Sequence, residues 1–192
     1  GLQVTLVERA GQLMATLDED MAAHVQDAAE GIGIEVRLGA ELQEVSEGAV
    51  RVDGDELPAD HVVLATGVRP ATGLARDAGL ELGDSGALRV DDHQRCPGHD
   101  GVFAAGDCVE SWHRVLQRPM NVQLGTHANK QGRIAGANAT GGDVAFPGVI
   151  GTAASKICRY EVARTGITER EAAAAGIEVR AATTKDRTRA GY

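Results

Sequence analysis

The heptapeptide Gly-Val-Phe-Ala-Ala-Gly-Asp at 101–107 constrains this chain most strongly. It predicts a short apolar strand that ends at a glycine followed by a carboxylate. Gly106 has no Cβ, so another molecule can approach its main chain closely, and Asp107 can accept hydrogen bonds from two hydroxyls. Because ligands of open α/β sheets bind outside the carboxyl ends of the strands, the stretch predicts a binding site. A strand running into a plain Gly-Asp turn is the alternative for the dipeptide alone.

Composition argues against several classes of protein for this chain. The 192 residues carry 28 acidic and 19 basic side chains, a net charge of −9, and no basic run, which argues against a nucleic-acid partner. No apolar stretch approaches the roughly 20 residues of a membrane span, and no signal peptide is recognisable. Cys96, Cys108 and Cys158 are too far apart for a disulfide framework or a zinc site. We therefore expect a cytoplasmic protein without a metal, built as one large or two small domains.

The first segment indicates half of a nucleotide-binding unit. Residues 2–7 predict a buried strand that ends at Glu8. An acid at the end of the second strand of a dinucleotide-binding fold accepts hydrogen bonds from the adenosine ribose, about 20 residues after a glycine-rich turn that here would precede residue 1. Arg9 could accommodate a 2′-phosphate, but Glu8 would repel it, so NAD(H) is favoured over NADP(H). A solvated strand end is the alternative for Glu8.

The next elements follow from periodicity and turn residues. Asp18 is expected to cap a helix that runs to about Glu30, with Met21 in its core face. Alternating strands follow, and the last ones form a β-meander around an Asp-Gly-Asp turn. The expected strands are 34–38, 41–46, 49–52 and a short run at 56–57.

A second strand-to-glycine motif lies at 60–70. Residues 60–66 predict a buried strand, and Gly67 with the following Val-Arg-Pro predicts a turn that lets the main chain pass close to a cofactor. A short helix within 71–82 and a short strand at 88–91 then lead to the 101–107 stretch.

A hairpin is expected around Trp112 and Met120, followed by a helix that begins at Gly125. The expected buried face of this helix consists of small residues, namely Ala128, Gly132, Ala135 and Ala139. Its positive N-terminus would stabilise an electron-rich ring edge. At His127 we expect the backbone N–H to matter more than the imidazole.

The last segment predicts a strand pair within 151–164 and a helix that opens with a Thr168–Glu171 capping box and ends at Gly176. A further strand is expected at 177–181, so the segment has the start of an α+β domain.

Four motifs follow one another along the chain in this order: Val-Thr-Leu-Val-Glu-Arg, Leu-Ala-Thr-Gly-Val-Arg-Pro, Val-Phe-Ala-Ala-Gly-Asp and Gly-Thr-His-Ala-Asn-Lys-Gln-Gly-Arg. Together they resemble the FAD-dependent pyridine nucleotide–disulfide oxidoreductases. The tail, with Gly-Thr-Ala-Ala-Ser-Lys and Glu-Val-Ala-Arg-Thr-Gly-Ile-Thr-Glu-Arg-Glu-Ala, is similar to the branch of coenzyme A-disulfide reductases, NADH oxidases and NADH peroxidases.

The resemblance implies the fold and the roles of residues. The fold would be α/β, with partial Rossmann-like FAD- and NAD(P)-binding domains, a β-meander and the start of an α+β dimerisation domain. The implied boundaries are 1–70 for the second half of the NAD(P)-binding domain, 71–146 for the second part of the FAD-binding domain and 147–192 for the start of the dimerisation domain. Glu8 would bind the NAD(H) ribose, Gly67 would line the nicotinamide nucleotide path, Gly106 and Asp107 would hold the FAD ribitol, and Gly125, Thr126, His127 and Ala128 would face the flavin pyrimidine edge.

The activity implied is hydride transfer from NAD(P)H to FAD, with electrons passing on to a disulfide, a peroxide or oxygen, in a homodimer with a small-molecule substrate. The glycine-rich turns and the redox cysteine of the family are absent from these 192 residues. We therefore expect a truncated chain that binds FAD weakly or not at all and does not turn over. The alternatives are a reductase that passes electrons to a ferredoxin-like protein and a non-catalytic dimerisation module.

Overall fold

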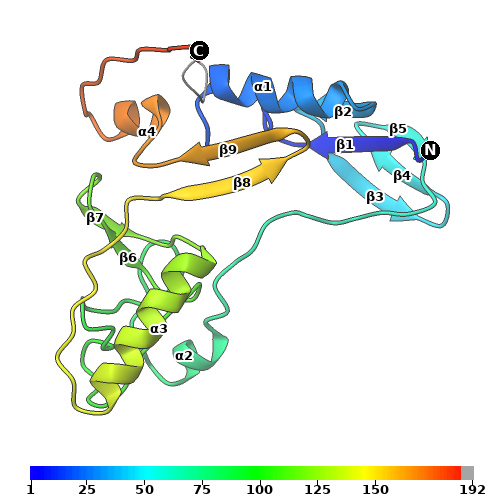
Figure 1. Ribbon diagram of the computed structural model, residues 1–192. Coiled ribbons are helices and arrows are strands. Elements are labelled where there is room, and N and C mark those ends of the chain that lie inside the picture. The colour runs from blue at the N-terminus through cyan, green and yellow to red at the C-terminus, as the bar shows by residue number, and fades with distance from the viewer. Residues whose placement is uncertain (187–192) are drawn as a thin grey trace.

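The computed structural model describes residues 1–186. Its chain forms two lobes joined by the extended segment 59–72 (Figure 1). The first, here called the β1 lobe, contains residues 1–58 together with the C-terminal hairpin and helix. The second, here called the α3 lobe, contains residues 73–149 (Figure 1).

The β1 lobe is built on a β-α-β unit. Strands β1 (Val4–Glu8) and β2 (Ile34–Leu38) are parallel, with Val4 opposite Ile34. Helix α1 (Glu19–Glu30) connects them, and its small apolar residues Ala22, Val25, Ala28 and Ala29 are buried. Parallel neighbours need such a crossover connection. The carboxyl end of β1 therefore places Glu8 at the edge where ligands of parallel sheets bind.

The predicted β-meander is confirmed. Strands β3 (Leu42–Ser46), β4 (Ala49–Val52) and β5 (Asp55–Pro58) are antiparallel and form one sheet in that order. The turn between β4 and β5 has positive φ at both Asp53 (51°) and Gly54 (90°). A glycine at the second position is what a tight hairpin of this kind requires.

The α3 lobe contains helices α2 (Gly73–Asp77) and α3 (Gly125–Ala139) and the hairpin of β6 (Ser111–His113) and β7 (Arg118–Met120). Its small apolar core is formed by Leu88, Cys96 and Val109. Much of the remainder is irregular chain held by turns and isolated bridges, such as Arg95 with Phe103.

After the α3 lobe the chain returns to the β1 lobe (Figure 1). Strands β8 (Ala153–Ile157) and β9 (Tyr160–Arg164) form an antiparallel hairpin, followed by helix α4 (Glu169–Ala174). Ile157 and Val162 pack on the core around Leu17 and Val25. The strand pair and the Thr168–Glu171 capping box are both confirmed.

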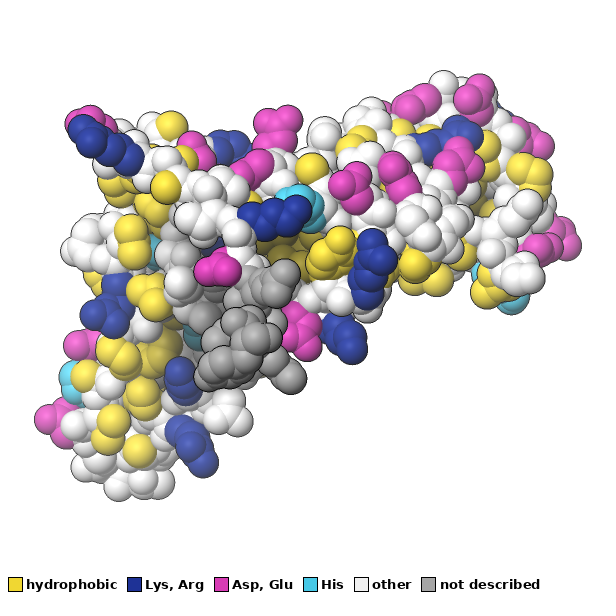
Figure 2. All heavy atoms as spheres, turned by 45° about the horizontal axis from the view of Figure 1, so that its top comes forward, with side chains coloured by type: hydrophobic (Ala, Val, Ile, Leu, Met, Phe, Trp, Pro, Cys, Tyr) yellow, Lys and Arg dark blue, Asp and Glu magenta, His cyan; other side chains and the backbone are white. Residues whose placement is uncertain are grey.

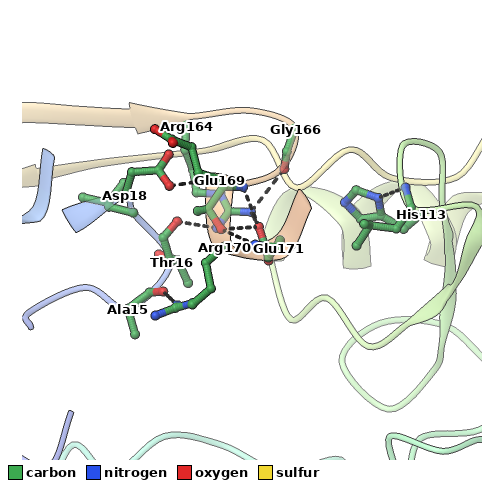
Figure 3. Close-up of polar contacts among 12 residues, drawn as sticks. Ala15, Thr16, Asp18, His113, Arg164, Gly166, Glu169, Arg170 and Glu171 are labelled. Carbon is green, nitrogen blue, oxygen red and sulfur yellow. Dashed lines mark hydrogen bonds and ion pairs between the residues drawn. The ribbon is translucent and has the colours of Figure 1, made fainter. Parts of the chain in front are cut away.

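Polar contacts also join the C-terminal hairpin and helix to residues 15–18 (Figure 3). The Arg164 guanidinium donates to the carbonyl oxygen of Thr16, and Arg170 donates to that of Ala15. The carboxylate of Asp18 accepts from the backbone N–H of Glu169 at 2.8 Å. The loop before α1 is therefore hydrogen-bonded both to β9 and to the first turn of α4.

Several predicted strands are wrong. Residues 60–66 are exposed and unpaired, with Val63 89% exposed. The stretch 101–105 has only the single bridge at Phe103, 88–91 has only isolated bridges at Leu88, and 177–181 forms no strand. An apolar extended run becomes a strand only where a neighbour supplies hydrogen bonds. Among residues 1–186, β1 and β2 pair only with each other.

Smaller corrections concern side chains. Met21 is 41% exposed instead of lying in the core, and the first two residues of β1 are exposed. Asp18 stands at the N-cap position of α1 but makes no side-chain bond to that helix, because its carboxylate bonds to α4 instead. Figure 2 shows acidic side chains spread over the right-hand end, which belongs to the β1 lobe.

Candidate functional site

The Gly106–Asp107 turn lies directly against helix α3. Gly106 has φ +90°, and a Cβ placed on it would lie 3.6 Å from the Ala128 side chain. Its backbone N–H donates to Oε1 of Gln131 at 2.9 Å. The positive φ therefore favours a glycine here, and the Ala128 side chain lies at ordinary van der Waals distance from the position of the missing Cβ.

Asp107 has a fixed main chain and an exposed side chain. Its carbonyl oxygen accepts a 2.8 Å hydrogen bond from Nδ2 of Asn121, which also donates to the carbonyl of Val109 at 2.9 Å. The residue as a whole is exposed. The turn thus presents a carboxylate, an acceptor for two hydroxyl groups, from a rigid backbone.

Helix α3 begins beside this turn. Its N-cap is Leu124, which offers no side-chain cap, and Gly125 and Thr126 are exposed. The N–H groups of His127 and Ala128 both donate to the Leu124 carbonyl, at 2.9 and 3.0 Å. The His127 N–H is therefore already bonded within the chain, and its contact with a ligand stays a prediction. Gly125 and Thr126 are the exposed residues of the positive helix end.

His127 itself is buried, with 8% of its surface exposed. Burial lowers the pKa of the imidazole, a bond with the Val122 backbone opposes the shift, and Lys130 adds to it. In the described part of the chain, Nδ1 has no hydrogen-bond partner. The lowered pKa favours the neutral form of this imidazole in the first turn of α3.

The buried face of α3 is polar, not made of small residues as predicted. His127, Gln131 and Asn138 are its buried residues, whereas Gly132 and Ala139 are exposed. Gln131 is a site residue that sequence reasoning missed. Its spacing of four from His127 and seven from Asn138 marks one helix face and could have revealed it.

The eight predicted site residues fall into three places. Gly106, Asp107 and the 125–128 turn come together in the α3 lobe. Glu8 stands at the end of β1, where its Oε1 accepts from the Ala10 N–H at 2.7 Å. Gly67 lies in the exposed segment between the lobes, with φ +88°. The structure joins six of these residues and leaves two apart.

The joined residues fit one part of a flavin dinucleotide. An exposed carboxylate suits the hydroxyls of a ribitol, the missing Cβ of Gly106 leaves room for close approach, and the positive end of α3 suits an electron-rich ring edge. Burial raises the pKa of the Cys96 thiol in the core of this lobe. Because the thiolate is the reactive form, Cys96 is not a candidate nucleophile.

Comparisons with known proteins identify the family of the chain. The profile of the family described as "Pyridine nucleotide-disulphide oxidoreductase" matches residues 1–132. The chain is 33% identical over 201 residues to the NAD(P)H sulfur oxidoreductase (CoA-dependent) of Pyrococcus furiosus, covering all of this chain and 44% of that protein. It is 36% identical over 197 residues to an NADH oxidase of Methanocaldococcus jannaschii, with the same two coverages.

A solved structure of an NAD-dependent persulfide reductase from A. fulgidus superposes with a TM-score of 0.86 at 38% identity, covering 91% of this chain and 34% of that one. The chain thus spans less than half the length of these curated relatives. Within residues 1–186, no helix is long and apolar enough to cross a membrane.

Proposed function

The chain belongs to the pyridine nucleotide-disulphide oxidoreductase family, and on this premise we propose that it forms part of an FAD-dependent NAD(P)H oxidoreductase. Its α3 lobe would hold FAD, and its β1 lobe would hold the pyridine nucleotide. The observation that carries the proposal is the Gly106–Asp107 turn, which lies against α3 beside Ala128 and is hydrogen-bonded to Gln131.

Each residue has a specific task in this proposal. Asp107 accepts hydrogen bonds from ribitol hydroxyls, Gly106 admits the cofactor close to the backbone, and Gly125 and Thr126 present helix-end N–H groups to the pyrimidine edge. Glu8 accepts from the ribose of NAD(H), and Gly67 lines the path of the nucleotide. The bound flavin supplies the hydride and electron chemistry, while the protein positions it and excludes competing reactions.

We propose a sulfur compound of the disulfide or persulfide type as the electron acceptor, with peroxide or oxygen as the other candidates. Support comes from the names of two relatives, a sulfur oxidoreductase and a persulfide reductase. The oxidase among the relatives supports oxygen. Steady-state assays with each acceptor under anaerobic and aerobic conditions distinguish these outcomes.

The domain boundaries 1–70, 71–146 and 147–192 remain proposals, supported by the extended segment 59–72 and by the return of the chain after residue 149 (Figure 1). The homodimer is proposed on the family alone. We further propose that these 192 residues by themselves bind FAD weakly or not at all and do not turn over, because no G-x-G-x-x-G motif occurs in them.

The function is tested in the complete gene product by anaerobic mixing with NADH. We expect the flavin absorbance near ~450 nm to bleach, as for a flavin accepting a hydride. Asp107→Ala should lose most of its FAD, whereas Asp100→Ala, an exposed acid of the same lobe, should keep it. Full flavin content in both variants would contradict the assignment of the site.

A further inference from the structure

Gln131 uses both ends of its side-chain amide although it is only 2% exposed. Oε1 accepts from the Gly106 N–H at 2.9 Å, and Nε2 donates to Oγ of Ser111 in β6. We propose that Gln131 is a positioning residue that fixes the Gly106–Asp107 turn against the first turn of α3 and thereby sets the affinity for FAD. This inference rests on the proposed function of that turn.

The orientation of the amide is determined by its two partners. The backbone N–H of Gly106 can only donate, so the carbonyl oxygen of Gln131 must face it. The NH₂ group then faces Ser111, whose hydroxyl can accept. Ser111 is itself buried, with 6% of its surface exposed. A reversed amide would set two donors against each other at Gly106, so Ser111 helps to select the orientation that holds the turn.

The location of Gln131 explains why it would act on the cofactor without touching it. Gly106 precedes Asp107 directly, and its φ of +90° sets the direction in which Asp107 leaves the turn. Gln131 also lies one helical turn beyond His127 on α3. A single side chain therefore relates the carboxylate to the helix end, the two features proposed to contact FAD.

Asn138 provides a matched control on the same helix face. It is also buried, at 6% exposure, and makes three hydrogen bonds: to the carbonyl oxygens of His93 and Val144, and from the Val144 N–H. None of these partners belongs to the Gly106–Asp107 turn. Asn138→Leu therefore removes a buried amide from α3 while leaving the proposed positioning contact in place.

The experiment measures the dissociation constant of FAD for the complete gene product after removal of its flavin, and the visible circular dichroism of the reconstituted flavin. Gln131→Met keeps the volume but removes both hydrogen bonds, and should weaken FAD binding about ten- to a hundredfold, as expected for an unpaired buried donor. Gln131→Glu keeps an acceptor for Gly106 but buries a carboxyl group, so it should weaken FAD binding less than Gln131→Met does. Asn138→Leu should lower thermal stability without changing FAD affinity or the dichroism.

Equal effects of Gln131→Met and Asn138→Leu on FAD affinity, or no effect of Gln131→Met, would overturn the inference. Asp107→Ala is measured in parallel: if it leaves FAD binding unchanged, the proposed function fails, and if it alone weakens binding, only the role of Gln131 fails. Should Gln131→Met not fold, Ser111→Ala decides. It spares the Gly106 bond but leaves the buried NH₂ group of Gln131 without its acceptor, so it should weaken FAD binding, and unchanged binding would overturn the inference.

Discussion

The carboxylate of Asp18, just before α1, accepts a 2.8 Å hydrogen bond from the backbone N–H of Glu169, 151 positions further along the chain. Thr168 already caps α4 through its own side chain, which accepts from the N–H of Glu171. The first turn of α4 is therefore capped both locally by Thr168 and by Asp18, which precedes α1 (Figure 3). This contact joins the two ends of the described chain.

Removing the Asp18 carboxylate should destabilise the packing of α4 against the loop before α1. Asp18→Ala is expected to cost about 1 kcal/mol, the usual value for a lost cap, and to speed hydrogen exchange in α4. Asp18→Asn keeps an acceptor oxygen and should lose less. Glu19→Ala, which changes an exposed neighbouring acid, serves as the control, and an equal loss there would contradict a specific role for Asp18.

Stability should fall as the solution becomes acidic, partly because of His113. This residue is 2% exposed, and its Nδ1 accepts from the Leu116 N–H at 3.1 Å. Burial lowers its pKa below the ordinary 6.5; Glu171 opposes the shift, while Arg164 and Arg118 add to it. The unfolded chain therefore binds the proton more readily, so the stability present above about pH 6.5 is lost as the pH falls toward the folded pKa.

The measurement for His113 is a series of denaturation curves from about pH 7.5 to about pH 5. His113→Gln removes the titration and should flatten the decline. His127 is also buried with a lowered pKa, so part of the decline should persist until both are replaced. A decline unchanged in the double variant would exclude these two imidazoles as its cause.

Gly106 and Gly67 share nearly the same φ, +90° and +88°, but only Gly106 has a neighbour where a Cβ would stand. Alanine at either position should cost about 1–2 kcal/mol for the left-handed backbone. Gly106→Ala should also weaken FAD binding, because it disturbs the turn against α3. Gly67→Ala should spare FAD and raise the KM for the pyridine nucleotide, and the opposite pattern would contradict both assignments.

Nucleotide preference should depend on Glu8. Glu8→Gln keeps an oxygen for the Ala10 N–H that the carboxylate now binds at 2.7 Å, but removes the charge that would repel a 2′-phosphate. We expect the ratio of kcat/KM for NADH over NADPH to fall several-fold, since the nearby Arg9 remains. An unchanged ratio would show that Glu8 does not face the ribose.

The sequence predicted elements well where the cause of folding is local. The capping box at Thr168 and Glu171, the Asp-Gly turn of the meander and the start of α3 at Gly125 all depend on neighbouring residues, and all are confirmed. The strands predicted at 60–66 and 177–181 fail because a strand depends on a partner that periodicity does not reveal.

The candidate site also divides into residues recognised from a local motif and residues that depend on distant contacts. Gly106 and Asp107 are recognisable from their motif. The spacing of Gln131 on α3 could have placed it on the buried face, but not its role, which comes from contacts with residues 25 and 20 positions away. Small residues on α3 suggested the wrong buried face, since Gln131 and Asn138 form hydrogen bonds there with residues 20 to 45 positions away. Hydrogen bonding of buried polar groups, not hydrophobicity, orients this helix.

The central claim is that the Asp107 carboxylate and the first turn of α3 hold FAD together. The most direct measurement is a crystal structure of the complete gene product with FAD bound. We expect a carboxylate oxygen of Asp107 about 2.5–3.0 Å from a ribitol hydroxyl, with the pyrimidine edge at Gly125 and Thr126 and the bond between Gln131 and Gly106 intact. FAD bound with its ribitol away from Asp107 would contradict it.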